Sequence, residues 1–128
     1  MKRRNFIISA LIVGTGLPAA YYLEKHKGGE NALARPDLLS RFCNDIELKA
    51  IGIKYRKDVP QENESQKLKD LLLTDQSGKK IKAADKILVD EMMTKKTQED
   101  FNAYNTLNIN GWVISVTEAR QCALFSLT

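Results

Sequence analysis

Side chains that commonly carry out catalysis or bind metals are scarce in this 128-residue sequence. Its only histidine is His26, close to the N-terminal apolar segment, so a histidine-based triad or metal site has no imidazole in the rest of the chain. The two cysteines, Cys43 and Cys122, are far apart and form no Cys-x-x-Cys pair. Zinc ribbons, iron–sulfur clusters and c-type haem attachment all need closely spaced cysteines.

Neighbouring carboxylates are the remaining candidates for acid–base chemistry. They occur as three close pairs, Asp45 with Glu47, Asp90 with Glu91, and Glu99 with Asp100. Glycosidase-type chemistry needs two carboxylates that converge in a cleft, and each of these pairs also suits a helix cap or an exposed helix face. The sequence therefore predicts no catalytic, cofactor-binding or metal-binding residue in this chain.

Two adjacent arginines, Arg3 and Arg4, precede a long uncharged segment. A basic stretch followed by an apolar one is the order of an export signal. One residue after the pair come Phe6 and Ile7, and this pattern resembles the twin-arginine signal of the pathway that exports folded proteins. We expect residues 1–23 to be such a signal, read by the twin-arginine translocase, with the rest of the chain exported to the periplasm.

Two other interpretations of this segment stay open. It could be an ordinary secretory signal. The uncharged run at residues 6–23 is also just long enough to span a bilayer if it is never cleaved. In that case these residues would anchor the protein at the periplasmic face of the inner membrane.

Most of the excess positive charge lies in the signal. Three of the 20 basic residues and none of the 16 acidic ones fall within residues 1–20, so 17 basic residues face 16 acidic ones in the rest of the chain. Nucleic-acid-binding domains carry a concentrated basic surface. We therefore expect no nucleic-acid partner.

Helical periodicity dominates the sequence after the signal. Apolar residues recur at three- and four-residue steps in the segments 36–46, 48–59, 64–73, 81–96 and 116–127. The first segment carries one stripe, made of Leu38, Leu39, Phe42, Cys43 and Ile46. With the second segment it could form a helix pair or one bent helix. We expect an all-α fold, a small helical bundle over residues 36–128, joined to the signal by a flexible spacer at residues 24–35.

Local signals mark the ends of these helices. Asn44 can cap the second segment, and Pro60 stops it because proline cannot continue a helix. An Asn-Gly pair at residues 110–111 predicts a turn. Ser115 and Glu118 have the spacing of a capping box, which predicts that the last helix begins there.

The signal and the rest of the chain together indicate a partner. The twin-arginine pathway moves folded proteins, many of which acquire a cofactor in the cytoplasm, yet nothing in residues 36–128 is suited to hold one. Both observations are satisfied if the cofactor belongs to another chain, which folds, docks on this protein and is exported on its signal. Arg3 and Arg4 would then serve the partner.

Three segments carry a family resemblance: L-L-S-R-F-C-N-D, I-G-I-K-Y-R-K-D-V-P-Q-E and N-G-W-V-I-S-V-T-E-A-R-Q-C-A-L. With the leader, they resemble the small (gamma) subunit of bacterial flavin-dependent sugar and sugar-acid dehydrogenases, of the gluconate 2-dehydrogenase subunit 3 type. The resemblance implies a non-catalytic escort of a large flavoprotein of the glucose-methanol-choline oxidoreductase type, which would bind FAD and oxidise a sugar hydroxyl, sometimes with a cytochrome c subunit. The alternative is a free-standing exported or membrane-anchored helical binding protein of the cell envelope.

Four residues in these segments are candidates for the partner interface: Gly52, Tyr55, Pro60 and Trp112. Each also has a core interpretation. Gly52 would let a neighbouring helix approach closely, and Tyr55 would pack with its hydroxyl at the edge of the core. Trp112 would anchor either the core or a partner, since tryptophan is enriched among interface hot spots.

The two cysteines, Cys43 and Cys122, can pair with each other in an oxidising compartment. Each lies on the apolar stripe of its predicted helix. We expect them to form a disulfide after export. Two buried free thiols, or a bond from one cysteine to the partner, are the alternatives.

Overall fold

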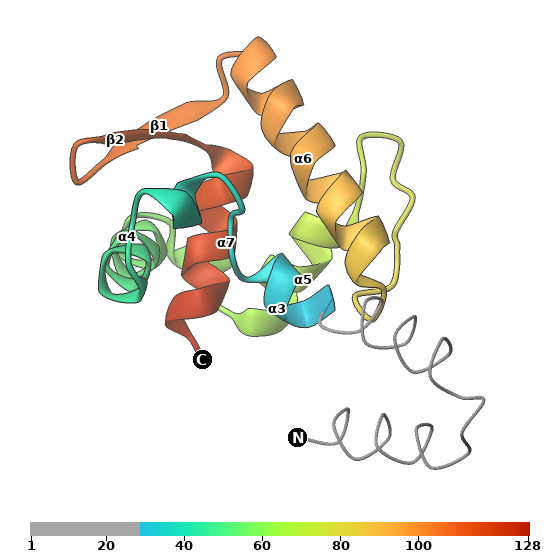
Figure 1. The fold of residues 1–128 in the computed structure, drawn as a ribbon, viewed down its shortest axis with the longest axis horizontal. Helices are drawn as coiled ribbons and strands as arrows, with labels where there is room; N and C mark the ends of the chain where they lie inside the picture. Colours follow the sequence, from blue (N-terminus) through green and yellow to red (C-terminus); the bar gives the residue numbers. More distant parts are fainter. Residues whose placement is uncertain (1–28) are drawn as a thin grey trace, which may run out of the picture.

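The computed structural model describes residues 29–128, in which helices dominate (Figure 1). In chain order the elements are α3 (Gly29–Leu33), the 3₁₀ helix η1 (Leu39–Arg41), α4 (Asp45–Asp58), the 3₁₀ helix η2 (Pro60–Glu62), α5 (Ser65–Leu73), α6 (Lys86–Asn102), β1 (Thr106–Ile109), β2 (Trp112–Ser115) and α7 (Val116–Ser126). Within residues 29–128 no helix is long and apolar enough to cross a membrane. The predicted signal, with Arg3, Arg4, Phe6 and Ile7, lies outside the described residues.

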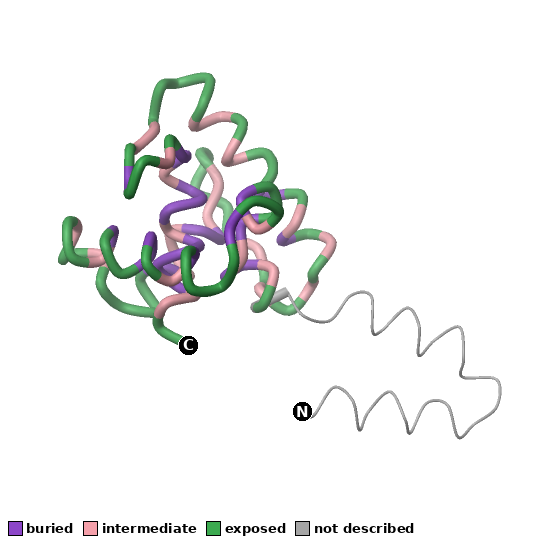
Figure 2. The backbone as a smooth tube through the Cα atoms, turned by 60° about the vertical axis from the view of Figure 1, so that its left-hand side comes forward, coloured by how far each residue is buried: buried purple, intermediate pink, exposed green. Residues whose placement is uncertain are grey.

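The C-terminal helix α7 lies at the centre of the fold, with α4 on one side and α5 and α6 on the other (Figure 1). Its buried residues are Thr117, Glu118, Ala119, Gln121, Cys122, Ala123 and Leu124. Apolar side chains of α4, α5 and α6 complete the core, among them Leu48, Ile51, Leu68, Leu72 and Val89. Figure 2 shows the buried stretches inside the molecule and the exposed ones around it. Because α7 is surrounded by other elements, its polar residues Thr117, Glu118 and Gln121 are buried as well.

Helix α4 begins and ends where the sequence predicts. The side chain of Asn44 accepts a hydrogen bond from the Glu47 amide, and the Glu47 side chain accepts one from the Asn44 amide, which completes a capping box. The helix ends at Asp58, and Pro60 begins η2. Ser115 and Glu118 form the same kind of box at the start of α7, as the sequence predicts.

The all-α expectation is only partly correct, because β1 and β2 form an antiparallel hairpin with Thr106 opposite Ser115. The predicted Asn-Gly turn joins the strands. Asn110 has φ 53° and Gly111 has φ 88°, the left-handed backbone that two-residue hairpin turns require. The turn was predicted, but the strands beside it are only four residues long and carry little pattern of their own.

The stripe predicted over residues 36–46 does not exist as one helical face. Leu39 and Cys43 are buried, whereas Leu38, Phe42 and Ile46 are exposed. The reason is local: η1 is only three residues long, and Asn44 adopts an extended backbone in order to cap α4. Residues before and after Asn44 therefore follow different axes, and neither a helix pair nor one bent helix forms here.

The predicted helix 81–96 starts later and runs further, as α6. Asp85 caps it, accepting hydrogen bonds from the amides of Ile87 and Leu88, so the residues before it belong to a loop. Near the middle of α6, the ammonium of Lys96 donates to the carbonyl oxygens of Leu71, Leu72 and Thr74 at the end of α5. This half-buried lysine therefore satisfies the carbonyl groups at the C-terminal end of α5.

The predicted spacer at residues 24–35 is wrong from residue 29 on. Residues 29–33 form α3, which packs against α6. Leu33 is fully buried, and Ala34 and Pro36 are buried beside it. Leu33 and Ala34 belong to the hydrophobic core and Ala32 packs against it. This packing involves distant parts of the chain, so no local sequence signal predicts it. The helical unit therefore begins before residue 36.

Candidate functional site

No three His, Cys, Asp or Glu side chains converge to form a metal site among residues 29–128. The neighbouring carboxylates have structural roles instead. Glu47 belongs to the capping box of α4, and Asp90 pairs with Lys86 one turn earlier in α6. Asp100 accepts hydrogen bonds from the amide and the hydroxyl of Thr117, which holds the end of α6 against the start of α7.

Helix α4 carries apolar side chains on two opposite faces. The inner face packs in the core through Leu48, Ile51 and Tyr55. Ile46 and Ile53, seven residues apart, share the opposite face. They are 79% and 53% exposed. The outer face of a helix that packs on a core is typically polar, so these two exposed side chains make the outer face of α4 a candidate contact surface.

Two more exposed side chains precede this face in the chain. Phe42 is 67% exposed, and Leu38 is also exposed. We call the set Leu38, Phe42, Ile46 and Ile53 the apolar surface. All four residues come from the segment that links α3 to α4 or from α4 itself.

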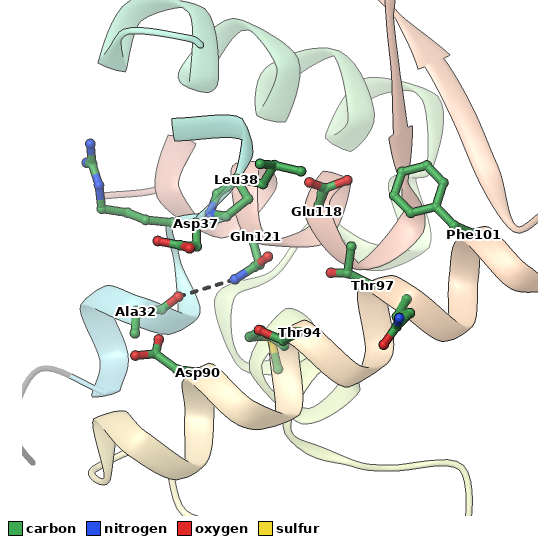
Figure 3. Close-up of a pocket in the computed structure, with 13 residues that line it drawn as sticks. Ala32, Asp37, Leu38, Asp90, Thr94, Thr97, Phe101, Glu118 and Gln121 are labelled. Carbon is green, nitrogen blue, oxygen red and sulfur yellow. Dashed lines mark hydrogen bonds between the residues drawn. The ribbon is translucent and has the colours of Figure 1, made fainter. Parts of the chain in front are cut away.

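A groove of about 400 Å³ lies between α3, α6 and α7 (Figure 3). Of the four residues of the apolar surface, Leu38 lines this groove. Glu118 and Gln121 of α7 line its interior, although the two residues are only 4% and 2% exposed. Thr97 of α6 extends toward Glu118 across the groove in Figure 3, and Phe101 lies at the end of α6.

The groove is lined by more acidic than basic side chains. Its carboxylates are those of Asp37, Asp90 and Glu118, and Arg35 is the basic residue among the lining side chains. The Arg35 guanidinium is already engaged, at 2.6 Å from a carboxylate oxygen of Asp45 and 4.6 Å from the centre of the Phe125 ring. Asp37 and Asp90 are engaged as well, in ion pairs with Arg41 and Lys86, so most of the charges that line the groove are already matched.

The candidate interface residue Tyr55 is buried and belongs to a polar network between α4, η2 and α7. Its hydroxyl donates to Glu62 over 2.8 Å. Arg120 donates to both oxygens of the same carboxylate, over 2.9 and 3.1 Å. Burial alone would raise the pKa of Glu62, but the hydrogen bonds from Arg120 and Tyr55 outweigh it and lower the pKa below its usual value. Burial and the bond to Glu62 raise the pKa of Tyr55 to about 12.

The Tyr55 network predicts a loss of stability at alkaline pH. Because the pKa of Tyr55 rises from about 10 in the unfolded chain to about 12 in the fold, its contribution is complete below pH 10 and is lost as the pH rises toward 12. Tyr55→Phe should remove about 2 kcal/mol of that pH dependence. Urea unfolding of the wild type and of Tyr55→Phe, measured at several pH values between 10 and 12, tests this expected difference. Parallel curves for the two proteins between pH 10 and 12 would contradict the buried network.

The other candidate interface residues lie in or beside the core. Gly52 faces α7 at the closest approach of the two helices: a Cβ atom there would lie 2.0 Å from the Cys122 carbonyl oxygen. Pro60 is exposed at the start of η2. Trp112 is half-buried on β2 and packs against the core. Gly52 and Tyr55 thus have the core roles that the sequence suggested as an alternative.

Cys43 and Cys122 are both buried and free. Burial raises the pKa of both thiols, and Cys43 itself contributes to the rise at Cys122. The free thiols count against the expected disulfide and agree with the alternative of two buried thiols.

The folded protein should therefore carry two protected thiols. We expect neither Cys43 nor Cys122 to react with iodoacetamide in the native state, since the reactive species is the thiolate and both are buried. Both should react in denaturant without reductant. Mass spectrometry checks this: a native mass lighter by two hydrogens, with no alkylation in denaturant, would instead establish the disulfide.

The chain matches no family model, no curated protein and no solved structure. Its candidate site is therefore defined by its own geometry, namely the apolar surface and the groove beside it. Sequence reasoning identified Glu118 only as a cap and did not single out Gln121. The sequence feature that could have pointed to them is their spacing: Glu118 and Gln121 are polar residues one turn apart in a helix otherwise rich in small apolar residues.

Proposed function

We propose that this chain is a non-catalytic small subunit that binds a large FAD-dependent dehydrogenase of the glucose-methanol-choline type and supplies its export signal. The observation that carries the proposal is the second apolar face of α4, where Ile46 and Ile53 are exposed opposite the buried face. Burying such side chains against a partner is favourable by roughly 25 cal/mol per Å².

The rest of the proposal follows from the sequence. The twin-arginine pattern at Arg3 and Arg4 supports export of a folded cargo, and the resemblance of three segments to a dehydrogenase small subunit supports a flavoprotein as that cargo. The partner would bind FAD and oxidise a sugar or sugar acid in the periplasm. As in some members of the group that the chain resembles, a cytochrome c subunit could be the one that takes the electrons.

The apolar surface predicts which variants lose the partner. In the triple variant Phe42→Ser, Ile46→Ser and Ile53→Ser, the flavin that co-purifies with the native full chain should fall at least tenfold, because about 1.4 kcal/mol of lost binding energy is a tenfold loss of affinity. The unfolding free energy should change by less than about 1 kcal/mol, since all three side chains are exposed. The flavin absorbance of the purified complex is the measurement.

A matched control is available on other elements. Leu88 of α6 and Val113 of β2 are also exposed apolar residues, outside the apolar surface. Leu88→Ser with Val113→Ser should leave the co-purified flavin unchanged. If native protein brings down no flavoprotein at all, the chain is the free-standing envelope protein instead.

A further inference from the structure

The acidic side chains of α4 are all engaged within the fold. The Asp45 carboxylate lies 2.6 Å from the Arg35 guanidinium. The Asp58 carboxylate lies 3.1 Å from the Lys54 ammonium, and Glu47 belongs to the capping box. Each carboxylate of this helix therefore has a partner of its own.

Three cations of α4 have no such partner. Lys49, Arg56 and Lys57 form no ion pair with a carboxylate among residues 29–128. The Lys49 ammonium lies 5.3 Å from the centre of the Phe125 ring, and Nη1 of Arg56 donates to the Ser126 hydroxyl over 3.4 Å. Nε of Arg56 is buried and has no acceptor within the described part of the chain. Since a buried donor without an acceptor is costly, the hydrogen-bonding capacity of Arg56 is not used up by this chain.

The same three cations surround Ile53 on α4, which lies at the periphery of the fold (Figure 1). Residues three or four positions apart are neighbours on a helix surface. The cations stand four positions before Ile53, three after it and four after it. The outer face also carries, at the same steps, the exposed residues Ile46, Ala50 and Lys57. An exposed apolar stripe bordered by unpaired positive charge therefore runs along α4.

We propose that this face binds an acidic segment of the partner, in which apolar side chains are bordered by carboxylates. The apolar side chains would cover the stripe, and the carboxylates would pair with Lys49, Arg56 and Lys57. Complementary charge of this kind gives an interface its specificity and speeds association. The proposal rests on the proposed function in assigning the segment to the dehydrogenase subunit, but the preference for carboxylates belongs to α4 alone.

A lipid surface fits this face less well than a protein segment does. Anionic lipids attract concentrated clusters of lysine and arginine. Helix α4 carries four basic residues and three acidic ones, so its net charge is small. Single cations beside an apolar stripe instead match carboxylates placed at single positions of a folded partner.

The test uses the full chain, labelled with ¹⁵N, and a synthetic acidic peptide as the probe. The peptide repeats the unit Glu-Ala-Leu four times, and its analogue has Gln in place of Glu. At low ionic strength we expect saturable binding of the acidic peptide, with shifts of the backbone amides of Ile46, Ala50, Ile53 and Lys57. The glutamine analogue should bind about tenfold more weakly. Equal binding of the two peptides, or shifts confined to other elements, would overturn the proposal.

Two variants and a control assign the binding to α4. Lys57→Glu reverses an exposed charge beside Ile53 and should weaken binding of the acidic peptide about fivefold, an effect that salt should suppress. Arg56→Gln should weaken it about threefold. Lys82→Glu reverses the charge of an exposed lysine outside α4 that also has no ion pair among residues 29–128, and should have no effect. Unchanged affinity in Lys57→Glu would contradict the proposal even if Arg56→Gln failed to fold.

Two other occupants of the face would be recognised by the same proteins. Binding to phosphatidylglycerol vesicles that Lys57→Glu weakens, without binding of the acidic peptide, would make the occupant a lipid surface. Self-association in analytical ultracentrifugation that Ile53→Ser abolishes would make it a second copy of the chain. Either result would overturn the proposal.

This experiment is separable from the test of the proposed function. A flavoprotein that is retained equally by the wild type and by Lys57→Glu would reject only the acidic segment. Peptide binding that depends on Lys57, in a chain that brings down no flavoprotein, would reject the dehydrogenase proposal and keep the preference for an acidic partner.

Discussion

Gly52→Ala should destabilise the fold by about 3 kcal/mol, although alanine is the better helix former by about 1 kcal/mol. The reason is the contact between α4 and α7: the added Cβ would lie 2.0 Å from the carbonyl oxygen of Cys122 and 2.8 Å from the amide nitrogen of Ala123. Both neighbours are backbone atoms of a central helix, so they cannot rotate aside as a side chain could. The two helices would have to separate along their whole contact.

Urea unfolding followed by circular dichroism measures this effect. Ile53→Ala is the matched control, because it changes the adjacent residue of α4 to the same amino acid on the exposed face. We expect it to shift the unfolding free energy by less than about 1 kcal/mol. A Gly52→Ala protein as stable as the wild type would show that α4 and α7 do not meet at this position.

The second large effect concerns export. Replacing Arg3 and Arg4 with lysine should leave both this protein and the proposed flavoprotein partner in the cytoplasm. Lysine keeps the charge but does not reproduce the planar guanidinium pair that the twin-arginine receptor reads. Because the signal would serve both chains, periplasmic dehydrogenase activity should fall to background together with this protein.

Cell fractionation with antibodies against both chains, and activity in each fraction, would measure this result. Lys25→Arg is the control, since it makes the reverse exchange near the signal and leaves the arginine pair intact. The escort function loses its main support if the flavoprotein still reaches the periplasm without Arg3 and Arg4.

Sequence-local signals predicted α4, α5 and α7 well. The capping residues Asn44 and Ser115 lie within three residues of the groups they satisfy, and Pro60 acts on the helix just before it. Such interactions are complete within one turn of chain. These capping interactions do not depend on the rest of the fold. The local sequence is therefore enough to predict where these helices begin and end.

The errors arose where distant residues decide the structure. Phe42 and Ile46 fit a helical stripe with Leu39, but the burial of Leu39 depends on packing that the other two do not share. The sequence of residues 29–35 predicted a spacer, because α3 is held in place by contacts with α6, a segment far away in the chain. The hairpin strands are too short to show a period of their own, and their pairing depends on the turn between them.

The sequence by itself determined that the folded part is mainly helical and where several helices begin and end, whereas the close contact of Gly52 with α7 needed the structure. Local hydrogen bonds and side-chain size are properties of a few neighbouring residues. Only the tertiary structure paired Arg120 with Glu62 across 58 residues and left Ile46 and Ile53 exposed behind a buried face. It also placed Gln121 and Glu118 in a groove with α3 and α6, because burial and charge at a site depend on which distant segments surround it.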